Sequence, residues 1–520
     1  MKKIINRNLI LFLSACILLN ESCTKDFTTY NTDENAITVI TKSEYPLIFN
    51  RALSITMMNG AFYETTHNYY GDIYAQYYSK SVGTERYAVD LTNYVDRMYT
   101  LAYSRGGASL KVIMDNAEVE SGETALSNIV WVYSFSRLTD QVGPIPYTKA
   151  FGNSEGNSIA YDKMEDIYND FFVRLTNAVN ALKALNSSAI VFNAQDNLYA
   201  GNISKWIKFA NTLKLRLAMR ISKVNPTKAK QMAEEAIASG VLLENADNAS
   251  VARNTVGNDY NAVSMISTWN ATSMSSTMKS YLGGYNDPRL PVYFQKRPGA
   301  TDYKSRRNGM TATDIGLAGN GNADQSIAGP YWVTFNGTTL VSNSNARQQV
   351  MCAAEAYFLR AEAALNGWSA GGSAKELYEE GIRKSLQQWG ITSATTIGEY
   401  ISSTNLPSAP NDFHKSAAVS STPIKWSSNT AEQRKQVGTQ KWLAVYPDGV
   451  EAWTEFRRTG FPDLYAVLNS DNADLPVGNF INRLVYHSTE YTRNLEGIQS
   501  GIAHLSGPDK ASTKLWWDID

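Results

Sequence analysis

The sequence predicts a mostly α-helical protein, in which a helical scaffold contains tetratricopeptide-like helix pairs and long insertions of loop and short strand. Three observations predict it. Apolar residues recur at helical spacing over many stretches of the chain. Two of these stretches are followed, after a short turn with Gly or Pro, by a second helical stretch. Segments rich in Asn, Gly, Ser and Thr separate them.

Composition places the chain among globular proteins. Of 520 residues, 43% are hydrophobic and 19% charged, which excludes a disordered or collagen-like chain and provides enough apolar residues for a large core. Lys and Arg total 48 and Asp and Glu 49, so the formal net charge is −1. This balance gives no attractive field for a polyphosphate, and no nucleic acid partner is expected.

Cysteine and histidine are scarce. Two of the three cysteines, Cys16 and Cys23, lie in the N-terminal segment and Cys352 lies in a helical stretch, so the mature chain has no disulfide framework. The four histidines lack the spacing of zinc ligands. No cofactor is therefore predicted, although carboxylates can hold calcium, which leaves a structural calcium ion open.

The N-terminus has the pattern of an export signal. A basic segment, residues 1–8, precedes an apolar run from Leu9 to Leu19. Eleven helical residues extend about 16 Å, about half of a bilayer core. The run is thus the length of a signal peptide's apolar region and too short for a membrane span. The chain has no other apolar stretch long enough to cross a membrane.

A cysteine near the end of this signal predicts a lipoprotein with a lipidated first residue. Cys16 follows Leu13-Ser14-Ala15, the better match to the usual cleavage signal, but cutting there shortens the apolar run. Cys23 follows the whole run and precedes a polar tether, so we favour Cys23. This choice makes 1–22 a signal peptide and 23–520 one domain, anchored by acyl chains. A plain secreted protein is the alternative.

The first half of the mature chain contains several predicted helices. The pattern predicts that Ala125–Leu138 is buried on most sides and ends at the proline turn Gly143–Tyr147. One apolar stripe marks Met164–Leu185 as amphipathic. The other predicted helices here are Ser43–Met58 and a Tyr-rich helix at Asn68–Ser79.

Helix pairs follow at 204–239 and 350–389. In the first, Ser204 is the predicted N-cap and Gly240 the predicted stop. Tetratricopeptide repeats have this helix–turn–helix form with a period of about 34 residues. We therefore predict such pairs around 125–240 and 350–390; a helical domain without repeats is the alternative. The last predicted helices are Ala431–Tyr446 and Val450–Arg457.

Two polar insertions interrupt the scaffold, at 245–345 and 401–430. The first is longer than a plain connection needs, and insertions of this kind usually carry function.

Several separated segments together resemble the SusD/RagB family of outer-membrane nutrient-binding lipoproteins, in particular its SusD-like group, described as starch-binding and associating with the outer membrane. The segments are Cys23–Phe27, Asn31–Asn35, Gly143–Tyr147, Lys205–Asn211, Leu215–Arg220, Asn286–Leu290, Ala354–Ala363, Gln440–Ala444, Gly449–Trp453 and Phe456–Arg458. They occur in order over nearly the whole mature chain. The residues Asn20-Glu21-Ser22 before Cys23 depart from the usual lipoprotein signal.

The resemblance implies a helical scaffold with tetratricopeptide repeats, anchored by lipid at the cell surface in the outer membrane. It also implies a partner, a SusC-like TonB-dependent transporter barrel over which the lipoprotein lies as a lid. Family members capture glycans or, in some branches, peptides and deliver them to the barrel. They are not enzymes.

Catalytic motifs are absent from the sequence: it contains no G-x-S-x-G, Walker A or dinucleotide fingerprint. Carboxylate pairs occur at Glu234-Glu235, Glu355/Glu362 and Glu379-Glu380. Two acids could hydrolyse a glycoside, so an exported glycoside hydrolase is the alternative function. These acids lie on predicted helix faces, where solvation or ion pairing is the expected role, and we predict that Glu355 and Glu362 pair within a repeat beside Arg360.

Aromatic residues in the loops are the predicted ligand contacts, because sugar rings stack on Trp or Tyr while Asn or Arg binds hydroxyls. We predict an exposed platform at Trp332 with Tyr331, after a Gly-Pro turn. Trp269 beside Asn270 is the second candidate and Arg86-Tyr87 the third. The alternative for each of these residues is a structural role, in which its side chain packs its own loop against the protein and contacts no ligand. Trp206, Trp442 and Trp453 lie in apolar helical stripes and are predicted core residues.

Overall fold

The computed structural model describes residues 40–57, 60–80, 92–152, 158–186, 188–256, 259–470, 472 and 474–519. The chain divides after Tyr45, and the residues from Pro46 onward form one compact unit. Cys16, Cys23, Arg86 and Tyr87 lie outside the described residues, so the lipidation site and the third ligand candidate stay predictions.

Helices dominate the first hundred described residues, but their form differs from the prediction at the Tyr-rich segment. The elements are α3 (Tyr45–Thr56), α4 (Gly60–Tyr63), the π-helix η1 (Glu64–Asp72), β1 (Tyr78–Lys80), α5 (Thr92–Thr100), the π-helix η2 (Leu101–Gly107) and α6 (Ala108–Asn116). The prediction of one helix over 68–79 is wrong. Gln76 has a left-handed φ of 54°, which ends helical structure, and Tyr78 then pairs with Met274 in a sheet.

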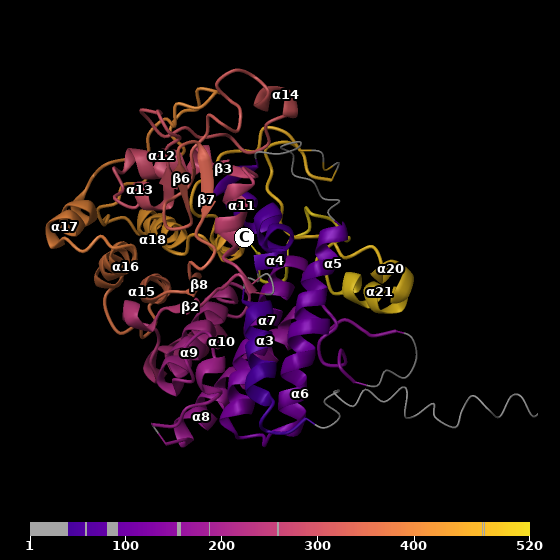
Figure 1. Ribbon diagram of the computed structural model, residues 1–520. Helices are drawn as coiled ribbons and strands as arrows, with labels where there is room; N and C mark the ends of the chain where they lie inside the picture. Colours follow the sequence, from indigo (N-terminus) through magenta and orange to yellow (C-terminus); the bar gives the residue numbers. More distant parts are fainter. Residues whose placement is uncertain are drawn as a thin grey trace, which may run out of the picture. The chain divides into compact units, whose positions relative to one another are not determined.

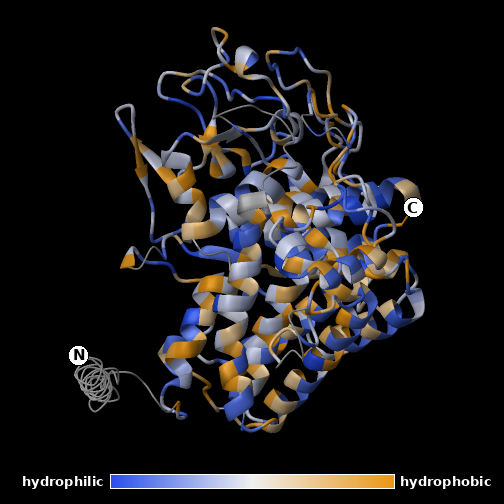
Figure 2. Cartoon of the chain, turned by 90° about the vertical axis from the view of Figure 1, so that its right-hand side faces the viewer, coloured by the Kyte–Doolittle hydropathy of each residue, from blue (hydrophilic) through white to orange (hydrophobic). Residues whose placement is uncertain are grey.

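Helix α7 (Gly122–Val142) is the buried centre of this region, as predicted from its apolar residues. Ser121 caps its N-terminus, and the helix ends at Gly143, whose φ of 95° suits glycine. Its neighbour α8 (Met164–Ala184) buries one stripe, which includes Ile167, Phe171 and Leu175. Figure 2 shows hydrophobic and hydrophilic residues along the same helices, as expected when one face packs inward.

The two predicted helix pairs are confirmed. Figure 1 shows α9 (Ile203–Arg220) beside α10 (Pro226–Ser239), and α15 (Ala353–Leu365) pairs with α16 (Ala374–Gln388). Gly240 ends α10 with a φ of 99°, as expected. The N-cap of α9 is Asn202 rather than the predicted Ser204, because the Asn202 side chain accepts a hydrogen bond from the Lys205 backbone at 3.0 Å.

Buried ion pairs connect helices that are distant in sequence. Arg216 of α9 binds both carboxylate oxygens of Glu355 of α15 at 2.7 Å. Glu362 receives two bonds from Arg458 of α19 (Gly449–Thr459) at 2.6 and 2.7 Å. The predicted pairing within a repeat is therefore wrong. Arg360 instead donates to backbone carbonyls of the following turn.

The C-terminal helices complete the core. Helix α18 (Thr430–Ala444) contacts α15, and α19 contacts η1 and α7. Asp448 caps α19 and also accepts two 2.8 Å bonds from Arg137 of α7. The predicted core residues Trp206, Trp442 and Trp453 are 2% exposed or less, which confirms that prediction. The remaining helices are α17 (Ala394–Ser402), α20 (Glu490–Arg493) and α21 (Leu495–Ala503).

The insertion at 245–345 forms short helices and two-stranded antiparallel sheets. Its helices are α11 (Ala262–Thr268), α12 (Ser276–Gly284), α13 (Leu290–Tyr293) and α14 (Ala312–Ile315). The sheets pair β1 with β3 (Thr272–Met274), β2 (Ala249–Val251) with β8 (Gln348–Met351), β4 (Phe294–Gln295) with β5 (Ile327–Ala328), and β6 (Val333–Asn336) with β7 (Thr339–Ser342). The 3-10 turn η3 (Asn193–Gln195) precedes the insertion, and the 3-10 turn η4 (Asn245–Asp247) begins it.

Arg289 fixes this insertion to the scaffold. It forms a fully buried ion pair with Asp287 at 2.6 Å. Its guanidinium also donates to Ser385 of α16 at 2.8 Å and to Gln440 of α18 at 3.0 Å. The insertion is thus held against helices from two later parts of the chain.

Candidate functional site

Trp332 lies in the core and cannot serve as the predicted platform. Its side chain is 1% exposed, and its ring centroid lies 5.4 Å from that of Trp389 and 5.5 Å from that of Tyr446. The hydroxyl of Ser264 in α11 donates to its carbonyl at 2.6 Å. The prediction of an exposed ring is wrong because segments distant in sequence close over this position.

Tyr331 lies beside it and is half-buried. Its ring meets Trp332 and Trp389 edge-on, and its hydroxyl donates to the Arg347 carbonyl at 3.2 Å. These contacts favour a structural role for Tyr331, which stays partly exposed.

Trp269 is the predicted ligand residue that the structure exposes. Asn261 caps α11 by accepting from the Ser264 backbone at 3.0 Å, and the helix ends seven residues later at Thr268. Trp269 follows at the C-cap with 47% of its surface exposed. Asn270 then adopts a left-handed φ of 59°, which turns the chain into β3. The turn between α11 and β3 therefore presents an indole ring to solvent.

Arg297 holds the residue next to this indole. Its guanidinium donates to the side-chain oxygen of Asn270, to the Asn322 carbonyl at 2.7 Å and to the Gln325 carbonyl at 2.7 Å. It also lies 5.9 Å from the ring centroid of Phe335 in β6. Burial lowers the pKa of Arg297, an effect that Asp324 opposes. We call Trp269, Asn270, Arg297 and Phe335 the Trp269 surface.

A polar cleft of about 730 Å³ lies elsewhere in the unit. Several amide side chains line it, and Arg347, whose carbonyl binds Tyr331, is among the residues that form it. The lining side chains include Asn197, Asn245, Asn248, Gln349, Gln387 and Gln388. Such groups can both donate hydrogen bonds to hydroxyls and accept them.

The acids that could support hydrolysis have structural partners. Glu355 and Glu362 are held by Arg216 and Arg458 as described, and Glu235 pairs with Lys214 at 2.8 Å. Glu380 lies 3.0 Å from Arg383 on the same helix. The predicted ion-paired role is confirmed for these residues. No group of three potential metal ligands among His, Cys, Asp and Glu occurs in the described part of the chain.

Sequence reasoning missed Arg297, Phe335 and the whole polar cleft. Arg297 precedes a Pro-Gly turn, and nothing in a single sequence connects it to Asn270. The cleft joins four segments, near 197, 247, 348 and 388, that only the fold brings together. A local motif could not have revealed either one.

Comparison with known proteins places the chain in a family. The family model described as SusD-like, "Susd and RagB outer membrane lipoprotein", matches residues 24–518. No curated protein matches the chain. Within the described residues, no helix is both long and apolar enough to cross a bilayer.

Solved structures agree with this match. A chitin-binding SusD homologue from Flavobacterium johnsoniae is 32% identical, with a TM-score of 0.82 over 92% of this chain and 99% of its own. A SusD homologue from Bacteroides uniformis is 30% identical, with a TM-score of 0.79 over 92% and 100%. A SusD-like protein from Bacteroides thetaiotaomicron is 29% identical, with a TM-score of 0.80 over 92% and 99%. The chain therefore belongs to the SusD/RagB family of outer membrane lipoproteins.

Proposed function

We propose that this protein is a lipid-anchored lipoprotein of the cell surface that binds oligosaccharides and delivers them to a TonB-dependent, SusC-like transporter. Membership of the SusD/RagB family supports the location and the partner. A relative at 32% identity is named as chitin-binding, which supports a carbohydrate ligand.

The exposed indole of Trp269 is the observation that carries the proposed ligand class. A flat apolar ring in water, beside fixed polar groups, suits the C–H face of a pyranose with its hydroxyls at the edge. Because Arg297 orients Asn270, the amide is held beside the ring before the ligand arrives. We place oligosaccharide binding on the Trp269 surface.

The first ligands to test are oligosaccharides of β-linked N-acetylglucosamine, the units of chitin, because of the Flavobacterium relative. Affinity gels with a panel of polysaccharides, followed by an assay for new reducing ends, test the proposal. We expect retardation by at least one polysaccharide and no release of reducing ends. Turnover that a single Glu or Asp substitution abolishes would instead indicate a hydrolase, and binding of peptides alone would overturn the glycan assignment.

Delivery is tested separately. Under mild detergent extraction at native expression, we expect the protein to co-purify with a large TonB-dependent barrel, because a lid must cover the mouth of its transporter. A permanent complex of this kind buries more than about 2,000 Å². Recovery only as a free monomer would contradict the transport role without affecting glycan binding.

A further inference from the structure

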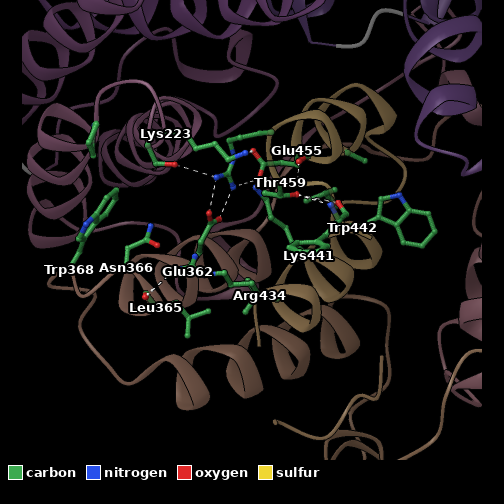
Figure 3. A pocket seen from close by; sticks show the side chains of 18 residues that line it. Lys223, Glu362, Leu365, Asn366, Trp368, Arg434, Lys441, Trp442, Glu455 and Thr459 are labelled. Carbon is green, nitrogen blue, oxygen red and sulfur yellow. Dashed lines mark hydrogen bonds and ion pairs between the residues drawn. The ribbon is translucent and has the colours of Figure 1, made fainter. Parts of the chain in front are cut away.

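A second cavity lies among the helices, between α15, α18, α19 and the turn that follows α9, and nothing above assigns it a role (Figure 3). Its volume is about 520 Å³, within the range of about 300–1,000 Å³ typical of ligand pockets. We call it the helix-pair pocket. Its lining includes Lys223, Glu362, Leu365, Trp368, Arg434, Val437, Gly438, Lys441, Trp442, Glu455, Arg458 and Phe461.

The walls of the pocket are largely apolar. Figure 3 shows Trp368 on one side of the pocket and charged side chains in the middle. On the other side, the ring of Trp442 points away from the pocket and is 2% exposed, so Trp368 supplies the accessible indole. Leu365 and Val437 add aliphatic surface. Gly438 has no side chain, and a Cβ there would lie only 2.6 Å from the Cβ of Phe461, so any larger residue would have to displace that ring.

The two acids of the pocket are already neutralised. Glu362 binds Arg458 at 2.6 Å, and Glu455 binds Arg458 at 2.7 Å and Lys441 at 2.9 Å. Burial acts to raise the pKa of Glu455, but the surrounding cations hold it well below its usual value. Both acids are therefore committed to cations within the protein.

Arg434 differs from these cations. It projects from α18, is half-buried, and donates to the backbone carbonyl of Leu365 at 3.2 Å. Across the residues that the structure describes, Arg434 has no carboxylate within ion-pair distance. A guanidinium has five donors in a planar fork, so most of its capacity for a carboxylate is available. Lys223 also lines the pocket, and its ammonium donates to the Ile519 carbonyl at 2.7 Å.

We propose that the helix-pair pocket binds a carboxylate that carries an aromatic or branched apolar group. Arg434 receives the carboxylate, and the apolar group packs against Trp368, Leu365 and Val437. A free organic acid and the C-terminal residue of a peptide share this chemistry. The charge balance excludes a cationic ligand, because the acids of the pocket are already paired.

Isothermal titration with three probes tests this pocket: N-acetyl-phenylalanine, its amide, and N-acetyl-Ala-Ala-Phe with a free carboxylate. We expect both acids to bind and the amide to bind at least about tenfold more weakly, as for loss of a charge-assisted hydrogen bond. Tighter binding of the tripeptide than of N-acetyl-phenylalanine would identify the ligand as the C-terminal end of a peptide. Equal affinities of these two acids would identify it as a free organic acid. Absence of binding by both acids, or equal binding of the amide, overturns the proposal.

Two variants locate the binding. Arg434→Gln should weaken binding of the acids about tenfold, whereas Arg383→Gln, a half-buried arginine of α16 that pairs with Glu380 at 3.0 Å, should not. Trp368→Ala provides a second pocket variant if Arg434→Gln fails to fold. Equal affinities in wild type, a folded pocket variant and the control would overturn the assignment. Oligosaccharide binding should persist in Arg434→Gln, which separates this pocket from the Trp269 surface.

Discussion

Trp332 and Trp269 lie in the same polar insertion, yet one is 1% exposed and the other 47%. The sequence around Trp332, after a Gly-Pro turn, resembles an exposed loop. Its burial comes from Trp389 and Tyr446, which are more than fifty residues away in the chain. Local sequence therefore identified both rings as candidates but could not distinguish a core residue from a surface residue.

Substitution of Trp332 by Ala should destabilise the protein. Removal of a buried Trp leaves a cavity and costs about 3–5 kcal/mol of the free energy of unfolding. Urea denaturation followed by circular dichroism measures this loss. Trp269→Ala is the matched control, because it removes the same ring from an exposed position; equal stability of both variants would contradict the burial of Trp332.

Asp72 predicts a pH dependence of stability. Burial, assisted by the negative charge of Asp448 and opposed by hydrogen bonds from Asn68 and Tyr63, raises the pKa of Asp72 from 3.8 to about 7. Between these values the native carboxyl holds a proton that the unfolded chain has released. The contribution of Asp72 to stability is therefore greatest below pH 3.8 and falls as the pH rises to about 7.

The variant Asp72→Asn keeps a neutral group at this position. Its free energy of unfolding should increase relative to that of the wild type as the pH rises across this interval. Urea denaturation of both proteins at several pH values measures the difference. A difference that is constant with pH would show that Asp72 is ionised in the native protein throughout.

At the scale of elements, periodicity predicted the helix pairs well because burial of a helix face leaves a local pattern. Helices α9 and α15 start within three residues of their predicted positions. The sequence was less informative where backbone contacts with distant strands decide the structure, as at Tyr78, which pairs with Met274. The ion pairs between helices also could not be predicted, since Glu355 and Arg216 are separated by 139 residues.

The Arg216–Glu355 pair should contribute strongly to the packing of α9 on α15. Glu355 is 1% exposed, so Glu355→Gln leaves a buried guanidinium without its bidentate partner. Breaking a buried pair costs about 3–5 kcal/mol. Glu379→Gln, which removes a half-buried partner of the exposed Lys375 at 3.8 Å on the surface of one helix, should cost about 1 kcal/mol or less. Denaturation curves of the two variants that coincide would contradict this role.

At the scale of the whole molecule, the family could be recognised from sequence because its segments are spread in order along the chain. The candidate site could not be recognised from sequence, because Asn270, Arg297 and Phe335 meet only after folding. The same holds for the helix-pair pocket, which draws on four segments between Ser222 and Phe461.

Anchoring is predicted to depend on Cys23. Cys23→Ala should move the protein from the membrane fraction to the soluble fraction, because the sequence offers no other membrane anchor after the signal. Fractionation with immunoblotting measures this change. Retention of lipidated Cys23→Ala in the membrane, with release of Cys16→Ala, would assign lipidation to Cys16.

Oligosaccharide capture at the Trp269 surface is tested most directly by isothermal titration of wild type, Trp269→Ala and Phe413→Ala, each with a thermal melt. The ligand is an oligosaccharide of the polysaccharide that binds on the affinity gels. Phe413, which is 45% exposed and lies in the insertion at 401–430, is the matched control because it is an exposed aromatic residue away from Trp269 in the sequence. We predict that Trp269→Ala weakens binding by about 1–3 kcal/mol, by analogy with base–aromatic stacking, with little change in melting temperature. Phe413→Ala should bind like wild type. Unchanged affinity in folded Trp269→Ala would contradict this site.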